Sequence, residues 1–135
     1  MTNLMRVDNL TKWYVEKKKK QTIKAVDGVS FTLEKGKILG IIGESGCGKS
    51  TLGRLLVALE NPTDGSIEFE GEIINHIVKK EPLRFRRNCQ MIFQNPFDTF
   101  DPRNDIQKIL TNALKIHNIG NSKEERVDIC IKAME

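Results

Sequence analysis

The segment that most constrains the fold of this chain is Gly43–Ser50, which reads GESGCGKS. It satisfies the pattern G-x-x-x-x-G-K-S/T, in which backbone N–H groups curl around phosphate oxygens and glycines allow the tight turn. The apolar stretch KILGIIG precedes it and is predicted to form a parallel strand covered on both faces. A helical stripe follows it, made by Leu52, Leu55, Leu56 and Leu59. A strand, a phosphate loop and a helix in this order indicate an α/β fold.

The loop pattern assigns chemistry to individual residues. Lys49 is expected to reach the β- and γ-phosphates, and the Ser50 hydroxyl is expected to bind Mg²⁺. The helix that begins near Lys49 adds the positive end of its dipole. A catalytic thiol at Cys47 is disfavoured, because no histidine lies nearby in the sequence. The candidate nucleotide-binding residues of the loop are Gly43, Glu44, Ser45, Gly46, Cys47, Gly48, Lys49, Ser50 and Thr51.

The remaining segments predict a sheet before the loop and helices at the end. Alternating patterns predict strands over MRVDNLTKWYV, over VDGVSFTLE and over SIEFEGEII, the last with a bend at Gly71. A turn at EKG is expected to join the second of these to KILGIIG. The short apolar run CQMIFQ is interpreted as a strand whose end delivers Gln94 to a site. Helices are predicted from Ile106 and from Ser122, which forms a capping-box pattern with Glu125.

Composition excludes some classes of protein. The 135 residues include 22 basic and 18 acidic side chains, a net charge of +4 that permits an anionic partner without choosing one. No apolar run approaches the roughly 18 residues of a membrane span, and the first residues do not resemble a secretory signal. Three cysteines without metal-ligand spacing fit a reducing compartment. These observations predict a cytosolic, globular protein.

Four segments, which include the glycine-rich loop, resemble one family: VDNLTKWY, the stretch AVDGVSFTLEKGKILGIIGESGCGKSTLGRLL, NPTDGSIEFEG and MIFQNPFDTFDPR. Together they resemble the nucleotide-binding subunits of ABC transporters. The FQNP segment followed by Pro102-Arg103 is similar to the ATPase subunits of dipeptide and oligopeptide importers. The resemblance implies ATP and Mg²⁺ as cofactors and a peripheral position at the cytoplasmic face of the cell membrane, or in the cytoplasm if unassembled. It also implies a second ATPase subunit and transmembrane permease subunits as partners.

The resemblance assigns two further residues. Tyr14 occupies the place of the aromatic residue that stacks on adenine, with Trp13 as the neighbouring alternative and a packed core aromatic as the structural one. Gln94 matches the glutamine that reaches Mg²⁺ and the attacking water and senses the membrane partner. The simpler alternative for Gln94 is a surface glutamine. With Lys49 it makes the candidate catalytic pair, and with Ser50 the candidate metal site.

The resemblance also implies a domain organisation. Residues 1–135 match the first part of one nucleotide-binding domain, with the β-subdomain and phosphate loop over about 1–95 and the start of the helical subdomain over about 96–135. An apolar strand ending in Asp-Glu (Walker B), an LSGGQ segment and the switch histidine are absent. The last helical stripe still runs at Glu135 without a cap. We therefore expect a truncated domain that binds nucleotide weakly and hydrolyses little alone.

The sequence leaves other functions open. The chain fits a noncatalytic remnant or an interaction module that docks on a transporter subunit. A small P-loop kinase or GTPase is disfavoured by the absence of an N-K-x-D motif. Arg84, Arg86 and Arg87 are interpreted as a charged approach to a strand, and the run Lys17–Lys20 as a hairpin tip. Neither supports nucleic-acid binding, because no aromatic interleaving or DNA-binding motif accompanies them. His76 and His117 are expected at the surface.

Overall fold

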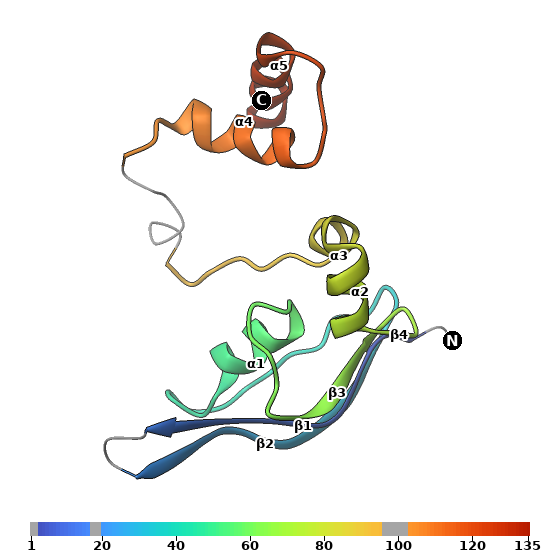
Figure 1. The fold of residues 1–135 in the computed structure, drawn as a ribbon, viewed down its shortest axis with the longest axis vertical. Helices are drawn as coiled ribbons and strands as arrows, with labels where there is room; N and C mark the ends of the chain where they lie inside the picture. The colour runs from blue at the N-terminus through green and yellow to red at the C-terminus, as the bar shows by residue number, and fades with distance from the viewer. Residues whose placement is uncertain (1–2, 17–19, 96–102) are drawn as a thin grey trace. The chain divides into compact units, whose positions relative to one another are not determined.

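The computed structural model describes residues 3–16, 20–95 and 103–135. The chain divides into two compact units, Met1–Met91 and Ile92–Glu135, which are considered separately (Figure 1). The elements of the first unit are β1 (Asn3–Glu16), β2 (Gln21–Glu34), α1 (Lys49–Leu56), β3 (Asp64–Phe69), β4 (Glu72–Ile73), α2 (Ile74–Lys80) and α3 (Pro82–Asn88). Those of the second unit are α4 (Ile106–Ile116) and α5 (Lys123–Met134). No helix in the described part of the chain has the length and apolar character that a membrane crossing needs.

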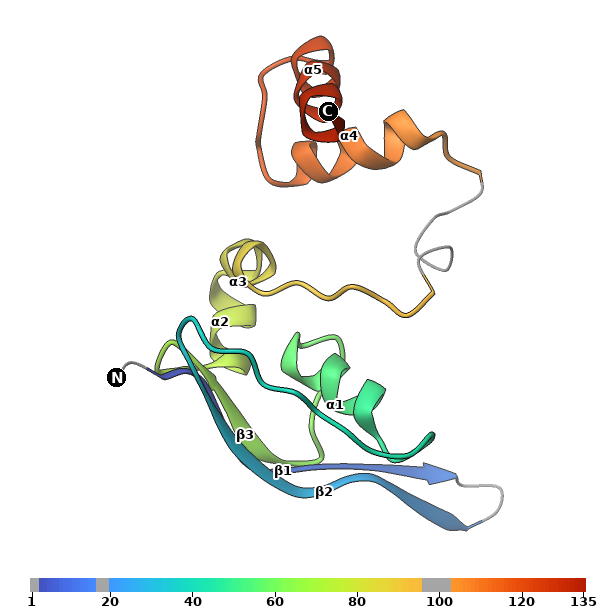
Figure 2. The same ribbon diagram turned by 180° about the vertical axis from the view of Figure 1, so that it is seen from behind.

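The first unit is built on a four-stranded antiparallel sheet with the order β2-β1-β3-β4. The strands β1 and β2 form a long hairpin, and β3 pairs with the other edge of β1. These elements confirm the three strands predicted from alternation, with a turn at Gly71 between β3 and β4. The helices α1, α2 and α3 lie on one side of the sheet in both views (Figures 1 and 2).

The core of the first unit lies between the sheet and these helices. Phe85 of α3 is fully buried and packs edge-on against Phe69 of β3, with ring centroids 5.7 Å apart. Val29, Phe31 and Leu33 of β2 pack against the core on one face, as their period-two spacing predicts. The buried core residues are Met5, Val7, Leu10, Val26, Leu52, Leu55, Ile67, Phe69, Ile74, Ile77 and Phe85.

A β-bulge interrupts β1 at Asn9. Asp8 pairs with Ser66 of β3 and Thr11 pairs with Asp64, so three steps along β1 match two along β3. Asn9 has a φ of 44°, in the left-handed region that asparagine tolerates better than most residues. An inserted residue of this kind shifts the alternation of side chains along the strand.

The shift decides which later side chains of β1 face the helices. Met5 and Val7 are buried on that side before the bulge, and Leu10 is buried there after it. The side of the sheet that faces the helices is therefore shared by Leu10 and Tyr14, whereas Trp13 points to the opposite side. Without the extra residue, the row that begins with Met5 and Val7 would continue to Trp13 instead.

Two predicted strands are wrong. Residues 37–43 form no strand in the described structure, and Ile38 and Ile42 are 99% and 98% exposed. Residues 89–94 likewise form no strand, and Ile92 is 97% exposed. An apolar run becomes a strand only when another strand supplies its hydrogen-bond partners. Among the described residues, no segment pairs with either run.

Smaller predictions for the first unit also need correction. The helix α1 ends at Leu56, so Leu59 lies beyond it and is exposed. Arg84, Arg86 and Arg87 lie on α3, not on the approach to a strand. Lys20 lies in a turn next to the paired residues Glu16 and Gln21, in agreement with a hairpin tip, while Lys17–Lys19 are outside the described residues. His76 is exposed, as expected.

The second unit confirms both predicted helices. Asp105 caps α4 by accepting from the Lys108 backbone N–H at 2.6 Å. Ser122 caps α5 by accepting from the Glu125 N–H at 3.1 Å, and the Glu125 carboxylate accepts from the Asn121 N–H at 2.7 Å. Neither helix contains a buried residue, so their apolar side chains form no buried core in the described structure. His117 is half-buried at the end of α4.

Candidate functional site

The glycine-rich loop leads directly into α1. Gly48 is the N-cap residue of this helix and adopts the left-handed conformation, with a φ of 98°. No side chain caps the helix, and its first turn contains no acidic residue. The free N–H groups of the first turn therefore keep their capacity to bind an anion, and the helix dipole favours it. Of the nine candidate residues from 43 to 51, only Thr51 is buried.

Close packing explains why two positions of the loop are occupied by glycine. A Cβ on Gly48 would lie 1.9 Å from the carbonyl oxygen of Ala25, so the end of the loop rests against β2. A Cβ on Gly43 would lie 2.6 Å from Cys47 Sγ, because the loop folds back on itself. Glycine removes both clashes, and at Gly48 it also permits the positive φ.

Lys49 turns back over the loop. Its Nζ donates to the carbonyl oxygens of Gly43 at 2.8 Å and Glu44 at 2.6 Å, and lies 3.6 Å from Cys47 Sγ. The loop thus holds a positive charge beside the uncapped start of α1. Ser50, in the first turn of the same helix, is exposed. The phosphate-binding residues predicted from the pattern are brought together in one loop and one helix turn.

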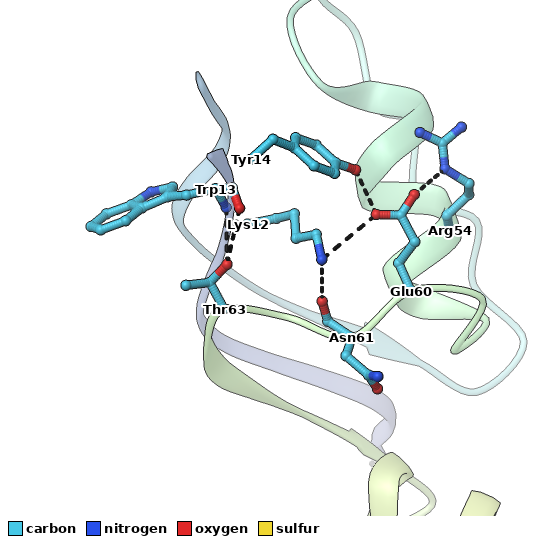
Figure 3. Close-up of polar contacts among 7 residues, drawn as sticks. All are labelled: Lys12, Trp13, Tyr14, Arg54, Glu60, Asn61 and Thr63. Carbon is cyan, nitrogen blue, oxygen red and sulfur yellow. Dashed lines mark hydrogen bonds and ion pairs between the residues drawn. The ribbon is translucent and has the colours of Figure 1, made fainter. Parts of the chain in front are cut away.

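Tyr14 reaches the residues that follow α1 (Figure 3). Its hydroxyl donates to Glu60 Oε2, and Arg54 Nε donates to Glu60 Oε1 at 2.6 Å. Lys12 Nζ donates to the Asn61 carbonyl at 2.7 Å and lies 3.8 Å from Glu60 Oε2. The same Nζ lies over the Tyr14 ring, 5.3 Å from its centroid. We call Lys12, Tyr14, Arg54 and Glu60 the Glu60 cluster.

Charges in the Glu60 cluster shift two pKa values. The hydrogen bond from Tyr14 lowers the pKa of Glu60 most, Arg54 and Lys12 lower it further, and partial burial opposes them. The hydrogen bond to Glu60 raises the pKa of Arg54, so this guanidinium stays charged. The cluster therefore holds a carboxylate between cations at neutral pH.

Trp13 points away from Tyr14 (Figure 3). Its Nε1 donates to Asp27 Oδ1 at 3.0 Å, and Lys24 Nζ lies 4.7 Å from the ring centroid. Thus Tyr14 and Trp13, adjacent in sequence, serve different sides of the sheet. Only Tyr14 is tied to the helix that begins at the glycine-rich loop.

Gln94 belongs to the second unit, next to the residues 96–102 that the structure does not describe. Its predicted contact with the metal therefore stays a prediction. Pro96 and Pro102 carry part of the family resemblance, and both lie outside the described residues.

Sequence reasoning missed the Glu60 cluster. Lys12, Arg54 and Glu60 are separated along the chain and match no phosphate-binding pattern. Only Arg54 and Glu60, six residues apart around the end of α1, carry a short-range signal of opposite charge. The long-range contact with Tyr14 depends on the bulge at Asn9, which no sequence pattern indicated.

Comparisons with known proteins identify the family of this chain. The family model "ABC transporter" matches residues 26–135. The chain is 41% identical over 132 residues to the putative oligopeptide transport ATP-binding protein YkfD of Bacillus subtilis, covering 98% of this chain and 40% of that protein. It is 43% identical over 136 residues to the dipeptide transport ATP-binding protein DppF of Escherichia coli, covering 97% and 40%. The chain therefore spans about 40% of the length of these relatives.

Solved structures show the same fold. The dimeric bacterial ABC transporter cassette MJ0796 superposes with a TM-score of 0.77 at 26% identity, covering 95% of this chain and 54% of that one. A second structure of the same cassette, in a post-hydrolysis state bound to ADP and Pi, matches with a TM-score of 0.77 at 24% identity and the same coverage. The family model, the curated relatives and the superposed cassettes all agree, and the chain belongs to the ABC transporter family.

Proposed function

We propose that this chain forms the phosphate-binding part of an ATP site, in a protein that powers the import of dipeptides or oligopeptides. One observation carries the proposal: the loop 43–50 presents an uncapped helix start next to the ammonium group of Lys49. The names of the relatives supply the nucleotide and the transported class, because they are dipeptide and oligopeptide transport ATP-binding proteins. The family supplies the use of ATP.

The residues of the loop fit a phosphate group. The first turn of α1 offers unpaired backbone donors and has neither a capping side chain nor a carboxylate to repel an anion. Gly46 and Gly48, with φ of 80° and 98°, shape the backbone without side chains on the loop. Lys49 has three N–H donors, of which the two carbonyl contacts use two. The third, near Cys47 Sγ, is free to turn to a phosphate oxygen, because thiol sulfur is a weak acceptor.

The residues also fit Mg²⁺ on chemical grounds. Mg²⁺ prefers oxygen ligands, and the exposed Ser50 hydroxyl in the first turn of α1 is one. The amide oxygen of Gln94 is the second proposed ligand, through the family resemblance. When bound, Mg²⁺ would neutralise charge on the phosphates and orient them. In this proposal Lys49 binds and orients the terminal phosphates, and Gln94 contacts the metal and the attacking water.

The aromatic contact and the partners complete the proposal. Tyr14 lies on β1 and is 36% exposed, so its ring keeps surface for stacking on adenine. Lys12 Nζ lies over one face of this ring, and we propose that the base stacks on the other face. The proposed partners are a second ATPase subunit and the transmembrane permease subunits, at the cytoplasmic face of the membrane. Residues 1–95 would supply the nucleotide contacts, and 96–135 would begin the helical subdomain.

Titration of the 135-residue chain with ATP and Mg²⁺ tests the binding site. We expect saturable binding that Lys49→Ala weakens at least about tenfold, because the variant loses a cation at the phosphates. Lys37→Ala is the matched control, since Lys37 is an exposed lysine outside the loop. Binding that is equally strong in wild type and Lys49→Ala would contradict the site.

Transport is tested in cells that lack their own copy of the gene. Uptake of a labelled dipeptide or oligopeptide should return with the full-length wild-type gene and not with its Lys49→Ala variant. Peptide uptake that is the same with and without the gene would refute the assignment to peptide import.

A further inference from the structure

The Glu60 cluster connects the hairpin to the glycine-rich loop through a single carboxylate. One oxygen of Glu60 accepts the Tyr14 hydroxyl from β1, and the other accepts Arg54 Nε from the last turn of α1 at 2.6 Å. The helix α1 begins at the loop that holds Lys49. The carboxylate is therefore the bridge between the proposed base contact and the proposed phosphate grip.

Backbone contacts fix the position of Glu60 itself. Its N–H donates to the Arg54 carbonyl at 3.4 Å, and the Leu59 N–H donates to the same carbonyl at 2.9 Å. Beyond it, the Asn61 carbonyl accepts from Lys12 at 2.7 Å, and the Thr63 N–H donates to the Thr11 carbonyl at 2.8 Å. The Glu60 side chain is only 23% exposed. A carboxylate that is held by its own backbone and by two cations is a rigid partner for the tyrosine hydroxyl.

We propose that Glu60 is a positioning residue for base recognition: it holds the Tyr14 ring at a set place relative to the glycine-rich loop. The inference rests on the proposed function, since it requires Tyr14 to contact the base. Glu60 itself touches neither base nor phosphate in this arrangement. Its loss should weaken the part of the affinity that comes from the base and leave the part that comes from the phosphates.

The test compares ATP with inorganic tripolyphosphate, which has the phosphates and no base, both titrated with Mg²⁺ into the 135-residue chain. Wild type should bind ATP more tightly. Glu60→Gln should reduce the ratio of the two affinities about three- to tenfold, the range for the net contribution of one typical hydrogen bond, and leave tripolyphosphate binding unchanged. Tyr14→Phe keeps the ring, removes the donor and should have the same effect. The double variant should be no worse than either single one.

Glu72→Gln is the matched control. Glu72 also pairs with an arginine, Arg84, at 3.0 Å, but on β4. We expect it to leave the affinity ratio unchanged. Thermal melting checks that each variant is folded. Tyr14 is the single tyrosine of the chain, so tyrosine labelling gives one set of ring NMR signals. These signals should move in Glu60→Gln and stay in place in Glu72→Gln.

The outcomes separate the inference from the function on which it rests. If Glu60→Gln weakens ATP and tripolyphosphate equally, its role is merely structural and the inference is wrong. If wild type binds both equally, the base contact is absent, and the inference fails while phosphate binding stands. If wild type binds neither, the proposed function itself fails.

Discussion

Gly48 lies so close to Ala25 that a Cβ on the glycine would sit 1.9 Å from the alanine carbonyl oxygen. The end of the glycine-rich loop is thus seated on β2, a strand of the hairpin that precedes it in sequence. The contact places the start of α1, where Gly48 is the N-cap, against the sheet.

This contact predicts a severe effect of Gly48→Ala. The new methyl group clashes with backbone that belongs to a paired strand, so the loop must move and ATP binding should be lost. Gly36→Ala is the matched control, because Gly36 has a similar φ of 76° but nothing within 4 Å of its Cβ position. The control should lose only about 1–2 kcal/mol in the free energy of unfolding, because a residue with a Cβ is strained in the left-handed conformation, and it should keep its ATP affinity. Urea unfolding and ATP titration measure the two effects. Equal ATP affinity in both variants would contradict the importance of the contact between Gly48 and Ala25.

Cysteine labelling should report on occupancy of the loop. Cys47 is exposed in the loop, whereas burial raises the pKa of the half-buried Cys89 and lowers its thiolate fraction. Iodoacetamide at neutral pH should therefore modify Cys47 faster than Cys89. ATP with Mg²⁺ should slow labelling of Cys47 and leave Cys89 unchanged. Peptide mass spectrometry gives both rates, and in Lys49→Ala the protection should disappear. Unprotected Cys47 at saturating ATP would speak against binding at the loop.

The lowered pKa of Glu60 predicts a pH-dependent contribution to stability. The hydrogen bond from Tyr14 is the main cause of the shift, and Arg54 adds to it. Since the carboxyl group binds its proton more weakly in the folded state, its stabilising effect is fully present above the ordinary pKa of glutamate. The effect is lost as the pH falls through the lowered folded-state pKa.

Urea unfolding of wild type and Glu60→Gln from pH 7 to pH 3 measures this effect. The difference in the free energy of unfolding should be largest near neutral pH and shrink on acidification. Glu72→Gln serves as the comparison for a second Arg–Glu pair. A difference between wild type and Glu60→Gln that does not vary with pH would contradict the assignment.

Phe85 should anchor α3 to the sheet. It is fully buried against Phe69 in an edge-on contact. Phe85→Ala should lower the free energy of unfolding by about 3–5 kcal/mol, because it removes a buried ring and leaves a cavity. Leu83→Ala on the same helix removes an exposed side chain and should cost far less. Calorimetry on both variants provides the comparison. Equal losses in the free energy of unfolding would contradict the role of Phe85 in the core.

Local patterns in the sequence determined the glycine-rich loop, the hairpin strands and the helix starts of this protein. The pattern from Gly43 to Ser50 predicted a phosphate loop that opens a helix, and α1 begins at Lys49. Alternation predicted the hairpin strands β1 and β2, and capping residues predicted the start of α5 at Ser122. These features depend on residues close together in the chain, so a sequence carries them.

Only the tertiary structure decided features that depend on distant partners. The apolar runs at 37–43 and 89–94 read as strands, yet in the described structure they lack a pairing strand. Which of the neighbours Tyr14 and Trp13 contacts the segment after α1 also depends on distant residues. The bulge at Asn9 shifts the alternation by one residue and turns Tyr14 toward α1 and Glu60, because in a strand a single inserted residue exchanges the two faces.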